Sequence, residues 1–194
     1  TDSCILGTQK GCSTSVCDGL SNQISSQLNA MGYSFKDVDT NWVHCSGHCQ
    51  LQSSAADNLA AAAQSKNDYI TLNSAWRSSA SQYLLYNWYN WGICGIGLAA
   101  TPGTSNHEGG RAIDTSYYDY WLTTLQNYGW THSYPSSDPV HFDYYAASDV
   151  AKQNLIAFQT LWNAHNPGST IAVDGIYGPD TSNALYNSPC GGWY

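Results

Sequence analysis

The chain has 194 residues, of which 42% are hydrophobic, so it can form one domain with a full core and is not disordered throughout. Its formal net charge is −8 with only six lysine and arginine residues, which argues against binding to nucleic acid or to an anionic membrane surface. No apolar run approaches the roughly 18 residues that a membrane-spanning helix needs, so no membrane association is expected.

Cysteine usage predicts an oxidising compartment. Seven cysteines are dispersed over the chain, at positions 4, 12, 17, 45, 49, 94 and 190. Such a pattern is typical of secreted proteins, and its simplest arrangement is three disulfides with one thiol left over. The sequence does not give the pairing. The chain does not start with the basic and apolar regions of a signal peptide, so we expect a mature secreted form.

The first half of the chain predicts alternating helices and strands. Residues 1–17 are rich in Cys, Gly and Ser and predict a disulfide-tied arm. The following apolar residues recur at helical spacing from Leu20 to Met31. The elements predicted here are, in chain order, a helix over residues 18–32, a loop over 40–53, a helix over 54–67, a strand over 69–76 that runs into Arg77, and a helix over 78–92.

The second half continues with shorter elements and then changes character. The predicted elements are a glycine-rich loop over residues 92–110, a strand over 111–116, a helix over 117–129, and strands over 130–134 and 140–145 on either side of a turn. After Tyr145 the pattern is helix, loop, tight turn and helix, with Pro179 or Asp180 opening the last helix. The interspersed pattern predicts an α+β fold, with a small antiparallel sheet, flanking helices and a short helical C-terminal appendage.

Three residues could hold a metal ion. His107 lies on the glycine-rich loop, Asp114 in a strand-like segment and His141 in another. Three nitrogen and oxygen ligands with a fourth position for water are typical of catalytic zinc. A His and an Asp at this spacing are, by themselves, more often ordinary surface residues. A glycine turn between two paired strands would nevertheless bring such ligands together.

Two further residues have the chemistry of a hydrolytic site. Asp138 precedes His141 by three residues across a Pro turn, from which a carboxylate could accept a proton from a metal-activated water. The alternative is that Asp138 only forms the turn. Arg77 follows a predicted strand, and its guanidinium could hold a carboxylate or a developing oxyanion. A surface ion pair is the alternative for Arg77.

These residues together resemble the zinc D-alanyl-D-alanine peptidase family, which includes VanX- and VanY-type enzymes and phage L-alanyl-D-glutamate endolysins. The segment from Ser105 to Asp114, SNHEGGRAID, matches every fixed position of the signature Ser-x-His-x-x-Gly-x-Ala-x-Asp. The downstream acidic-x-x-His motif is matched by residues 138–141, and the upstream aromatic-Arg-Ser motif by residues 76–78. The resemblance covers roughly residues 20–145.

The resemblance implies a role for each matched residue. His107, Asp114 and His141 would bind one Zn²⁺ ion. Asp138 would be the general base and then the acid for the leaving amine, and Arg77 would stabilise the oxyanion. Ser105 would shape the loop and is a candidate for substrate binding. Glu108 and Arg111 fall on variable positions of the signature and receive no role.

The tail carries a second resemblance. Residues 174–181, DGIYGPDT, are similar to the core of the peptidoglycan-binding repeat of cell-wall hydrolases, which makes Tyr177 a candidate substrate-binding residue. The repeat is shortened here, so a packing role for the tail, tied down by Cys190, is the alternative. We therefore expect a zinc peptidase domain over residues 1–147, including the arm over 1–17, and a peptidoglycan-binding-like segment over 148–194.

Other chemically suggestive stretches admit two interpretations. The segment HCSGHC, residues 44–49, could bind a metal, but in a secreted chain its cysteines are expected in disulfides, and a bond between Cys45 and Cys49 is one possible pairing. The aromatic helix over 78–92 could line a groove, although a core face is expected. Asp143 is expected to be a solvated strand carboxylate, with a supporting role behind His141 as the alternative.

The sequence thus predicts a secreted, monomeric zinc metallopeptidase that cleaves peptidoglycan stem peptides or cross-links. One alternative is a non-catalytic zinc-containing domain of the hedgehog type, which would not need Asp138 or Arg77. Another is a wall-binding protein in which the tail has the main role. The ligand set does not choose between a D,D-carboxypeptidase, a cross-link endopeptidase and an L-Ala-D-Glu endopeptidase. Asp138 in place of the Glu of the carboxypeptidases favours an endopeptidase-like geometry.

Overall fold

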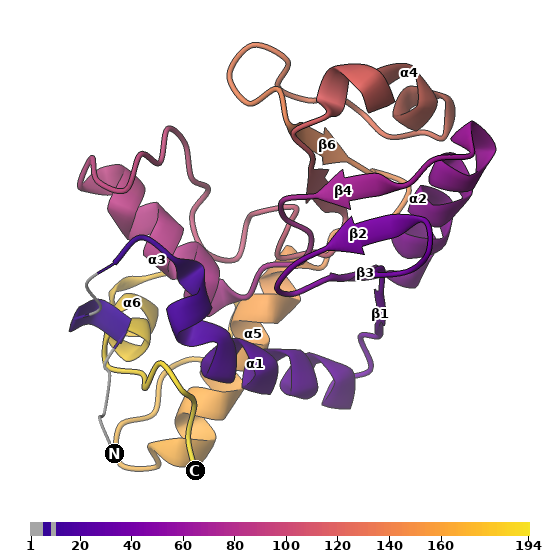
Figure 1. The fold of residues 1–194 in the computed structure, drawn as a ribbon. Coiled ribbons are helices and arrows are strands. Elements are labelled where there is room, and N and C mark those ends of the chain that lie inside the picture. The colour runs from indigo at the N-terminus through magenta and orange to yellow at the C-terminus, as the bar shows by residue number, and fades with distance from the viewer. Residues whose placement is uncertain (1–5, 9–10) are drawn as a thin grey trace. The chain divides into compact units, whose positions relative to one another are not determined.

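The computed structural model describes residues 6–8 and 11–194 (Figure 1). It combines helices with three two-stranded sheets among these residues, which confirms the predicted α+β class. The helices are two short 3₁₀ turns at Leu6–Thr8 and Thr14–Cys17, then α1 Asp18–Ala30, α2 Ser53–Lys66, α3 Ser79–Asn90, α4 Tyr118–Asn127, α5 Ala151–His165 and α6 Pro179–Tyr186. The strands are β1 Phe35–Asp37, β2 Val43–Cys45, β3 Gln50–Gln52, β4 Ile70–Leu72, β5 Ala112–Asp114 and β6 His141–Asp143.

The chain forms two compact units that each use several segments of sequence. A helical unit takes in Thr1–Tyr33, Ser78–Glu108 and Ala151–Tyr194, and an α/β unit takes in Ser34–Arg77 and Gly109–Val150. The tail helices α5 and α6 therefore share a unit with α1 and α3. The predicted division after residue 147 concerns which activity each segment carries, and it stays a prediction.

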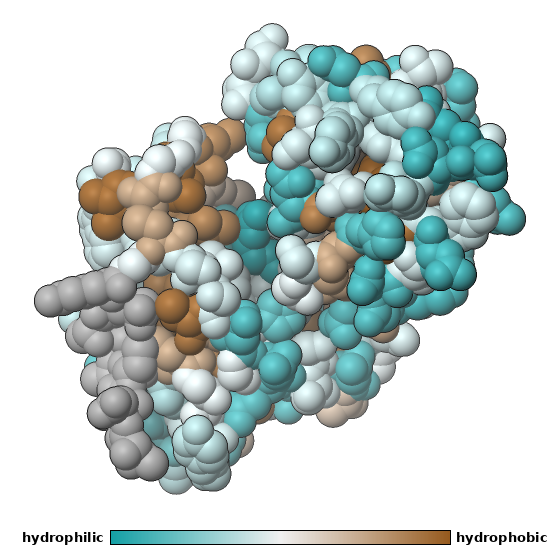
Figure 2. Space-filling model, in the orientation of Figure 1, coloured by the Kyte–Doolittle hydropathy of each residue, from teal (hydrophilic) through white to brown (hydrophobic). Residues whose placement is uncertain are grey.

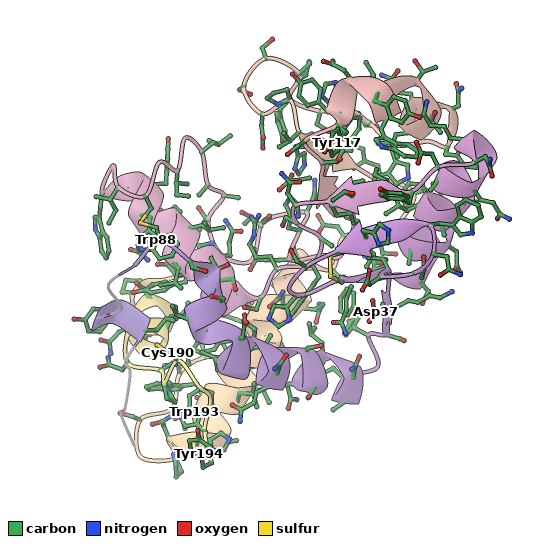
Figure 3. All side chains as sticks on the ribbon, viewed as in Figure 1. Asp37, Trp88, Tyr117, Cys190, Trp193 and Tyr194 are labelled. Carbon is green, nitrogen blue, oxygen red and sulfur yellow. A yellow bond between two sulfur atoms is a disulfide. The ribbon has the colours of Figure 1, made fainter. Side chains whose placement is uncertain are left out.

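Apolar faces of α1 and α5 form the centre of the helical unit. Leu20, Ile24 and Leu28 are fully buried on α1, as the helical spacing predicted, and α1 packs mainly against α5. The chain end returns to α5, where the ring of Trp193 stacks on that of His165 at 4.9 Å between centroids (Figure 3). The tail is thus a structural part of this unit.

Buried polar contacts fix the start of α3. The Ser78 hydroxyl caps the helix by accepting a hydrogen bond from the Ser81 backbone N–H at 3.0 Å. Asn154 on α5 is fully buried, and its Oδ1 accepts from both the backbone N–H and the hydroxyl of Ser79, at 2.9 and 2.7 Å. The serine of the aromatic-Arg-Ser motif therefore has a clear structural role as a cap.

Disulfides join several cysteines of the residues that the structure describes. Cys12 forms a disulfide with Cys94, and Cys190 is also disulfide-bonded. Cys17 is the free cysteine of the described residues, and it is buried, with its thiol 3.3 Å from the Ser81 hydroxyl. Burial raises the pKa of the Cys17 thiol, and hydrogen bonds from neighbouring serines oppose the shift only in part.

Three short strand pairs and two helices build the α/β unit. β2 pairs in parallel with β4, while β1 pairs with β3 and β5 with β6 in antiparallel fashion. The alanine-rich α2 buries Leu59 in the core, which also contains Trp121 of α4, Trp130 and Phe142 of β6. α2 ends at Lys66. The next residue, Asn67, has a left-handed conformation (φ 54°) and stops the helix, as glycine commonly does at this position. The core thus lies directly behind the strand pair β5–β6.

Several predicted boundaries were wrong in the α/β unit. Residues 40–53 were expected to be a loop but contain β2 and β3, and β1 was not predicted. The strand predicted over 69–76 shortens to β4, and that over 130–134 to the single bridge between Thr131 and Asp143. Strands of three residues are too short to show an alternating pattern, so their pairing depends on tertiary contacts that the local sequence does not reveal.

No helix of the described residues is long and apolar enough to cross a membrane.

Gly110 provides the turn that precedes β5, and we predict that it tolerates no side chain. Its φ is +64°, and a Cβ would fall 2.3 Å from Cε1 of Phe35 and 3.1 Å from the backbone N of Gln52. Gly110→Ala should therefore lower the free energy of unfolding by about 3 kcal/mol, from backbone strain and overpacking together.

The matched control is Gly47→Ala. Gly47 also has a positive φ of +85°, but a Cβ there would meet nothing within 4 Å, so a loss of about 1 kcal/mol is expected. Urea unfolding followed by tryptophan fluorescence measures both variants. Equal losses in the two variants would contradict the close packing at Gly110.

Candidate metal centre

The register of β5 with β6 places two predicted ligands directly opposite each other. Asp114 pairs with His141, Ile113 with Phe142 and Ala112 with Asp143. Directly opposed residues on an antiparallel pair point to the same face, with their Cβ atoms about 4.5–5.5 Å apart. Accordingly, Nδ1 of His141 lies 3.1 Å from Oδ1 of Asp114. The strand pair thus brings these two candidate ligands together.

Asp143 extends this arrangement behind His141. It lies two residues along β6, on the same face of the strand, and is fully buried. Its Oδ1 lies 3.0 Å from Nε2 of His141, and its Oδ2 accepts hydrogen bonds from the hydroxyls of Ser133 and Tyr145. The expectation of a solvated carboxylate was wrong, because period-two alternation in a three-residue strand gives no indication of which face is covered.

The charges of His141 and Asp143 support each other. Burial would lower the pKa of His141, but hydrogen bonds and charge from Asp114 and Asp143 outweigh it and raise the pKa. Burial would likewise raise the pKa of Asp143, but the hydrogen bond and charge of His141 outweigh it and hold the pKa well below its usual range. Asp143 therefore remains a carboxylate that can accept the Nε2–H of His141.

This contact selects the nitrogen that His141 can offer to a metal. If Nε2 carries the proton and donates it to Asp143, Nδ1 has a free lone pair on the side of Asp114. A carboxylate behind a histidine is the usual way in which proteins orient a metal-binding imidazole. Sequence reasoning named this role only as the less expected alternative.

His107 completes a group of three possible ligands. Each of His107, Asp114 and His141 offers one ligand atom, and these atoms all lie within 4.8 Å of one another. His107 and His141 are buried and the side chain of Asp114 is mostly buried, so the donors are shielded from water on most sides. Two imidazole nitrogens and a carboxylate oxygen at this spacing fit zinc, which binds such donors at about 2.0–2.2 Å.

The loop before His107 is organised by a residue that sequence reasoning passed over. The Glu108 carboxylate is fully buried and accepts hydrogen bonds from the backbone N–H groups of Gly103, at 2.9 Å, and Ser105, at 3.1 Å. The Ser105 hydroxyl accepts from the His107 N–H at 3.3 Å. The sequence offered one indication of this role, because Glu108 is the single charged residue at the end of a long loop that otherwise has no Asp, Glu, Lys or Arg. Ser105 as a substrate-binding residue stays a prediction.

Arg111, the other passed-over position of the signature, anchors the segment that enters β5. Its guanidinium pairs with Asp149 at 3.0 Å, donates to the carbonyl of Ala147 at 3.3 Å and lies over the ring of Tyr145. The two variable positions inside the motif therefore hold its flanking backbone rather than bind a metal.

The structure places Arg77 beside a ligand. Its Nη2 lies 3.9 Å from Oδ2 of Asp114 and donates to the Ser74 hydroxyl at 3.3 Å. Both Arg77 and Asp114 side chains are mostly buried. The isolated bridge between Ser74 and Asp114 joins this segment to β5, which explains how residues far apart in sequence meet.

Asp138 and His141 belong to one tight turn. The backbone N–H of Asp138 donates to the carbonyl of Tyr134, and that of His141 donates to the carbonyl of Asp138, at 2.8 and 3.2 Å. The predicted turn is therefore present and connects the candidate base to a candidate ligand, with Pro139 and Val140 between them. The catalytic role of Asp138 stays a prediction.

Two other candidates lie elsewhere in the fold. Cys45 and Cys49 form a disulfide, one of the pairings that the sequence left open, so the segment over residues 44–49 does not offer thiolates to a metal. Tyr177 of the tail packs edge-on against Tyr86 of α3, with 5.6 Å between ring centroids, and donates to the Ser182 hydroxyl. Its role in substrate binding stays a prediction.

Comparison with known proteins identifies the segment that contains most of this site. Residues 48–137 match the family model of VanY, D-alanyl-D-alanine carboxypeptidase. The predicted family resemblance is thereby confirmed. The VanY match includes Arg77, His107 and Asp114 and ends one residue before Asp138. No curated protein matches the chain. The resemblance of the tail to a peptidoglycan-binding repeat stays a prediction.

The buried carboxylate of Asp143 gives a direct test of the metal centre. Asp143→Asn keeps the shape but removes the charge that orients His141, so zinc affinity should fall about 10- to 100-fold. A competition titration against a fluorescent zinc chelator measures the change. The control is Asp119→Asn, which alters an exposed carboxylate on α4 and should leave zinc affinity unchanged. Equal zinc affinity in Asp143→Asn and the parent protein would exclude the orienting role.

Proposed function

We propose that the chain is a secreted zinc peptidase that hydrolyses peptide bonds in the stem peptides or cross-links of bacterial peptidoglycan. The VanY family match supports a D,D-carboxypeptidase-like peptidoglycan hydrolase. The observation that carries the zinc assignment is the convergence of His107, Asp114 and His141 within the reach of one ion. The orienting contact from Asp143 supports it independently.

The proposed set of three ligands leaves one coordination position of the zinc ion open for water or substrate. His107, Asp114 and His141 would hold the ion through three donors, as catalytic rather than structural zinc sites do. Bound zinc supplies Lewis acidity, which lowers the pKa of water and polarises a carbonyl oxygen. Catalysis then needs a base, an acid and a donor to the oxyanion from the protein.

In this proposal Asp138 acts first as the general base and then as the general acid. Its carboxylate would accept a proton from the attacking water and return it to the nitrogen of the leaving amine, which keeps the proton count balanced over one turnover. The tight turn to His141 fixes the backbone of Asp138 relative to a ligand and so limits its range of positions. Such preorganisation is what a proton-transfer group requires.

Arg77 fits the role of the group that stabilises the oxyanion. The guanidinium is held by Ser74 and by the charge of Asp114, which leaves it mostly buried and restricted in orientation. A preoriented cation would stabilise the negative charge that develops on the carbonyl oxygen of the scissile bond. A non-catalytic zinc domain of the hedgehog type has no need of either Arg77 or Asp138, so their presence favours the enzyme.

Extracellular location belongs to the same proposal. The disulfides Cys12–Cys94 and Cys45–Cys49 support folding in an oxidising compartment, where such bonds persist. A monomer is expected, with peptidoglycan as the partner. Asp138, in place of the Glu of the carboxypeptidases, favours an endopeptidase-like specificity, and mass spectrometry of products from defined muropeptides would identify the bond.

Removal of the metal should abolish activity. Dialysis against a strong chelator should stop hydrolysis of a soluble peptide ending in D-Ala-D-Ala or of a muropeptide cross-link, and one equivalent of Zn²⁺ should restore it. Amine release and metal content are measured on the same samples. Full hydrolysis by protein shown to contain no metal would refute the zinc mechanism.

Asp138→Ala should separate catalysis from binding. The rate of hydrolysis is expected to fall about 10²- to 10⁴-fold, because the general base and acid are lost, whereas zinc affinity should stay within twofold. Asp119→Asn, at an exposed position of α4, is the control and should retain full activity. If Asp138→Ala still cleaves purified peptidoglycan at the parent rate, the proposed role of Asp138 is wrong.

A further inference from the structure

Asn154 on α5 is a polar side chain with no exposed surface. Figure 2 shows hydrophilic residues over much of the molecular surface, where water can satisfy their hydrogen bonds, whereas a buried amide must find its partners within the protein. The Oδ1 of Asn154 accepts from the backbone N–H and the hydroxyl of Ser79, and its Nδ2 donates to the backbone carbonyl of Glu108 at 3.1 Å. One side chain therefore joins α5, the start of α3 and the end of residues 99–108, which we call the His107 loop.

The contact with Glu108 adds to the support of the His107 loop. The Glu108 carboxylate already holds the backbone N–H groups of Gly103 and Ser105. Asn154 holds the carbonyl of the same residue, so Glu108 is fixed through both its side chain and its backbone. Because His107 immediately precedes Glu108 in the chain, this arrangement limits the positions that the imidazole can reach.

Two neighbouring contacts hold the His107 loop against the same helices, which pack on each other (Figure 1). Gly103 has a φ of +87°, and a Cβ there would lie 3.0 Å from Cδ2 of Leu155 on α5. Gln82 of α3 is buried, and its Nε2 donates to the carbonyl of Ala100 at 2.7 Å. The loop is thus held by both helices at several points, independently of the atoms that would bind a metal.

The bonds to Ser79 act near a second candidate site residue. Ser79 is the first residue of α3, and Arg77 precedes it by two positions. Ser78 between them caps the helix with its own hydroxyl. Since Asn154 accepts from two groups of Ser79, it fixes the point at which the chain that carries Arg77 enters α3.

We propose that Asn154 is a positioning residue of the metal centre. Through Glu108 it fixes the backbone beside His107, and through Ser79 it fixes the backbone near Arg77. The helix α5 is then a working part of the peptidase, although it lies outside the segment that matches the VanY family. The inference rests on the proposed function, because it assigns Asn154 to the zinc site and to the reaction proposed there.

A second buried amide on the same helix provides a matched control. Gln159 is also fully buried, and its Oε1 accepts from the backbone N–H groups of Asp174 and Gly175 at 3.0 and 2.8 Å. Its Nε2 donates to the Thr181 hydroxyl at 3.0 Å and to other groups of the same turn. Gln159 thus ties α5 to the tail as Asn154 ties it to the loop. Loss of either amide leaves buried partners unsatisfied, so both variants should lose stability to a similar extent.

Zinc affinity and thermal stability are measured on Asn154→Ala and Gln159→Ala. Asn154→Ala should weaken zinc binding about tenfold, as the loss of support behind a ligand does, whereas Gln159→Ala should bind zinc within about twofold of the parent protein. Competition against a fluorescent chelator gives the affinity, at a temperature where both variants are folded. Parent-like zinc affinity in Asn154→Ala would overturn the inference. An equal fall in both variants would also overturn it, because general destabilisation would then be the cause.

Steady-state kinetics of the zinc-loaded protein give a second measurement. At saturating zinc, Asn154→Ala should lower kcat for a soluble D-Ala-D-Ala peptide or muropeptide about tenfold and change KM less than about twofold, because misplaced groups weaken transition-state contacts most. Gln159→Ala should keep both parameters. A raised KM with unchanged kcat would contradict the positioning role. If Asn154→Ala does not fold, Asn154→Leu, which keeps the branched shape without the amide, replaces it in each measurement.

Hydrogen exchange of the metal-free protein separates a failure of this inference from a failure of the proposed function. The amide hydrogens of Gly103 and Ser105 should be protected in the parent protein without zinc, and Asn154→Ala should accelerate their exchange about tenfold. Gln159→Ala should instead accelerate exchange at Gly175. This pattern in a parent protein that binds no zinc would refute the zinc peptidase but support the positioning of the loop. Fast exchange at Gly103 and Ser105 in the metal-free parent would overturn the positioning role without any variant.

Discussion

The register of β5 with β6 is the constraint on which the candidate site depends. Because Asp114 lies directly opposite His141, two candidate ligands from segments far apart in sequence come together. The same register places Asp143 on the same face of β6, where it holds the other nitrogen of His141. A shift of one residue would turn all three side chains to the opposite face and disperse the site. Phe142 and Ile113 face the core between them and so oppose such a shift.

The surroundings of this strand pair explain the functions of residues that no motif assigns. Ser133 and Tyr145 donate to Asp143, which keeps a fully buried carboxylate charged beside an imidazole. Glu108 satisfies the backbone of the loop that carries His107, and Arg111 holds the segment that leads into β5. Two of the charged side chains, Glu108 and Arg111, therefore shape the backbone near the candidate ligands.

The sequence predicted the fold class and the three candidate ligands that the structure brings together, but not the residues that support them. The triplet of His107, Asp114 and His141 was predictable because a motif with fixed spacing specifies both residue type and local turn. The longer helices were predictable because apolar residues recur at helical spacing over several turns, so no single residue decides the assignment. The roles of Asp143 and Glu108 were not, since the burial of a single carboxylate depends on distant segments. Strands of three residues, such as β2 and β3, were not predicted either, because their pairing also depends on distant segments.

The odd cysteine has a consequence for how this chain reaches its native pairing. Exchange between thiols and disulfides requires a thiolate that can approach a sulfur atom. Cys17 is buried among serine hydroxyls and its pKa is raised, so in the folded protein it is both inaccessible and protonated. Once α1 and α3 have packed, the leftover thiol is removed from the reaction. The native disulfides are then protected from rearrangement by the fold itself.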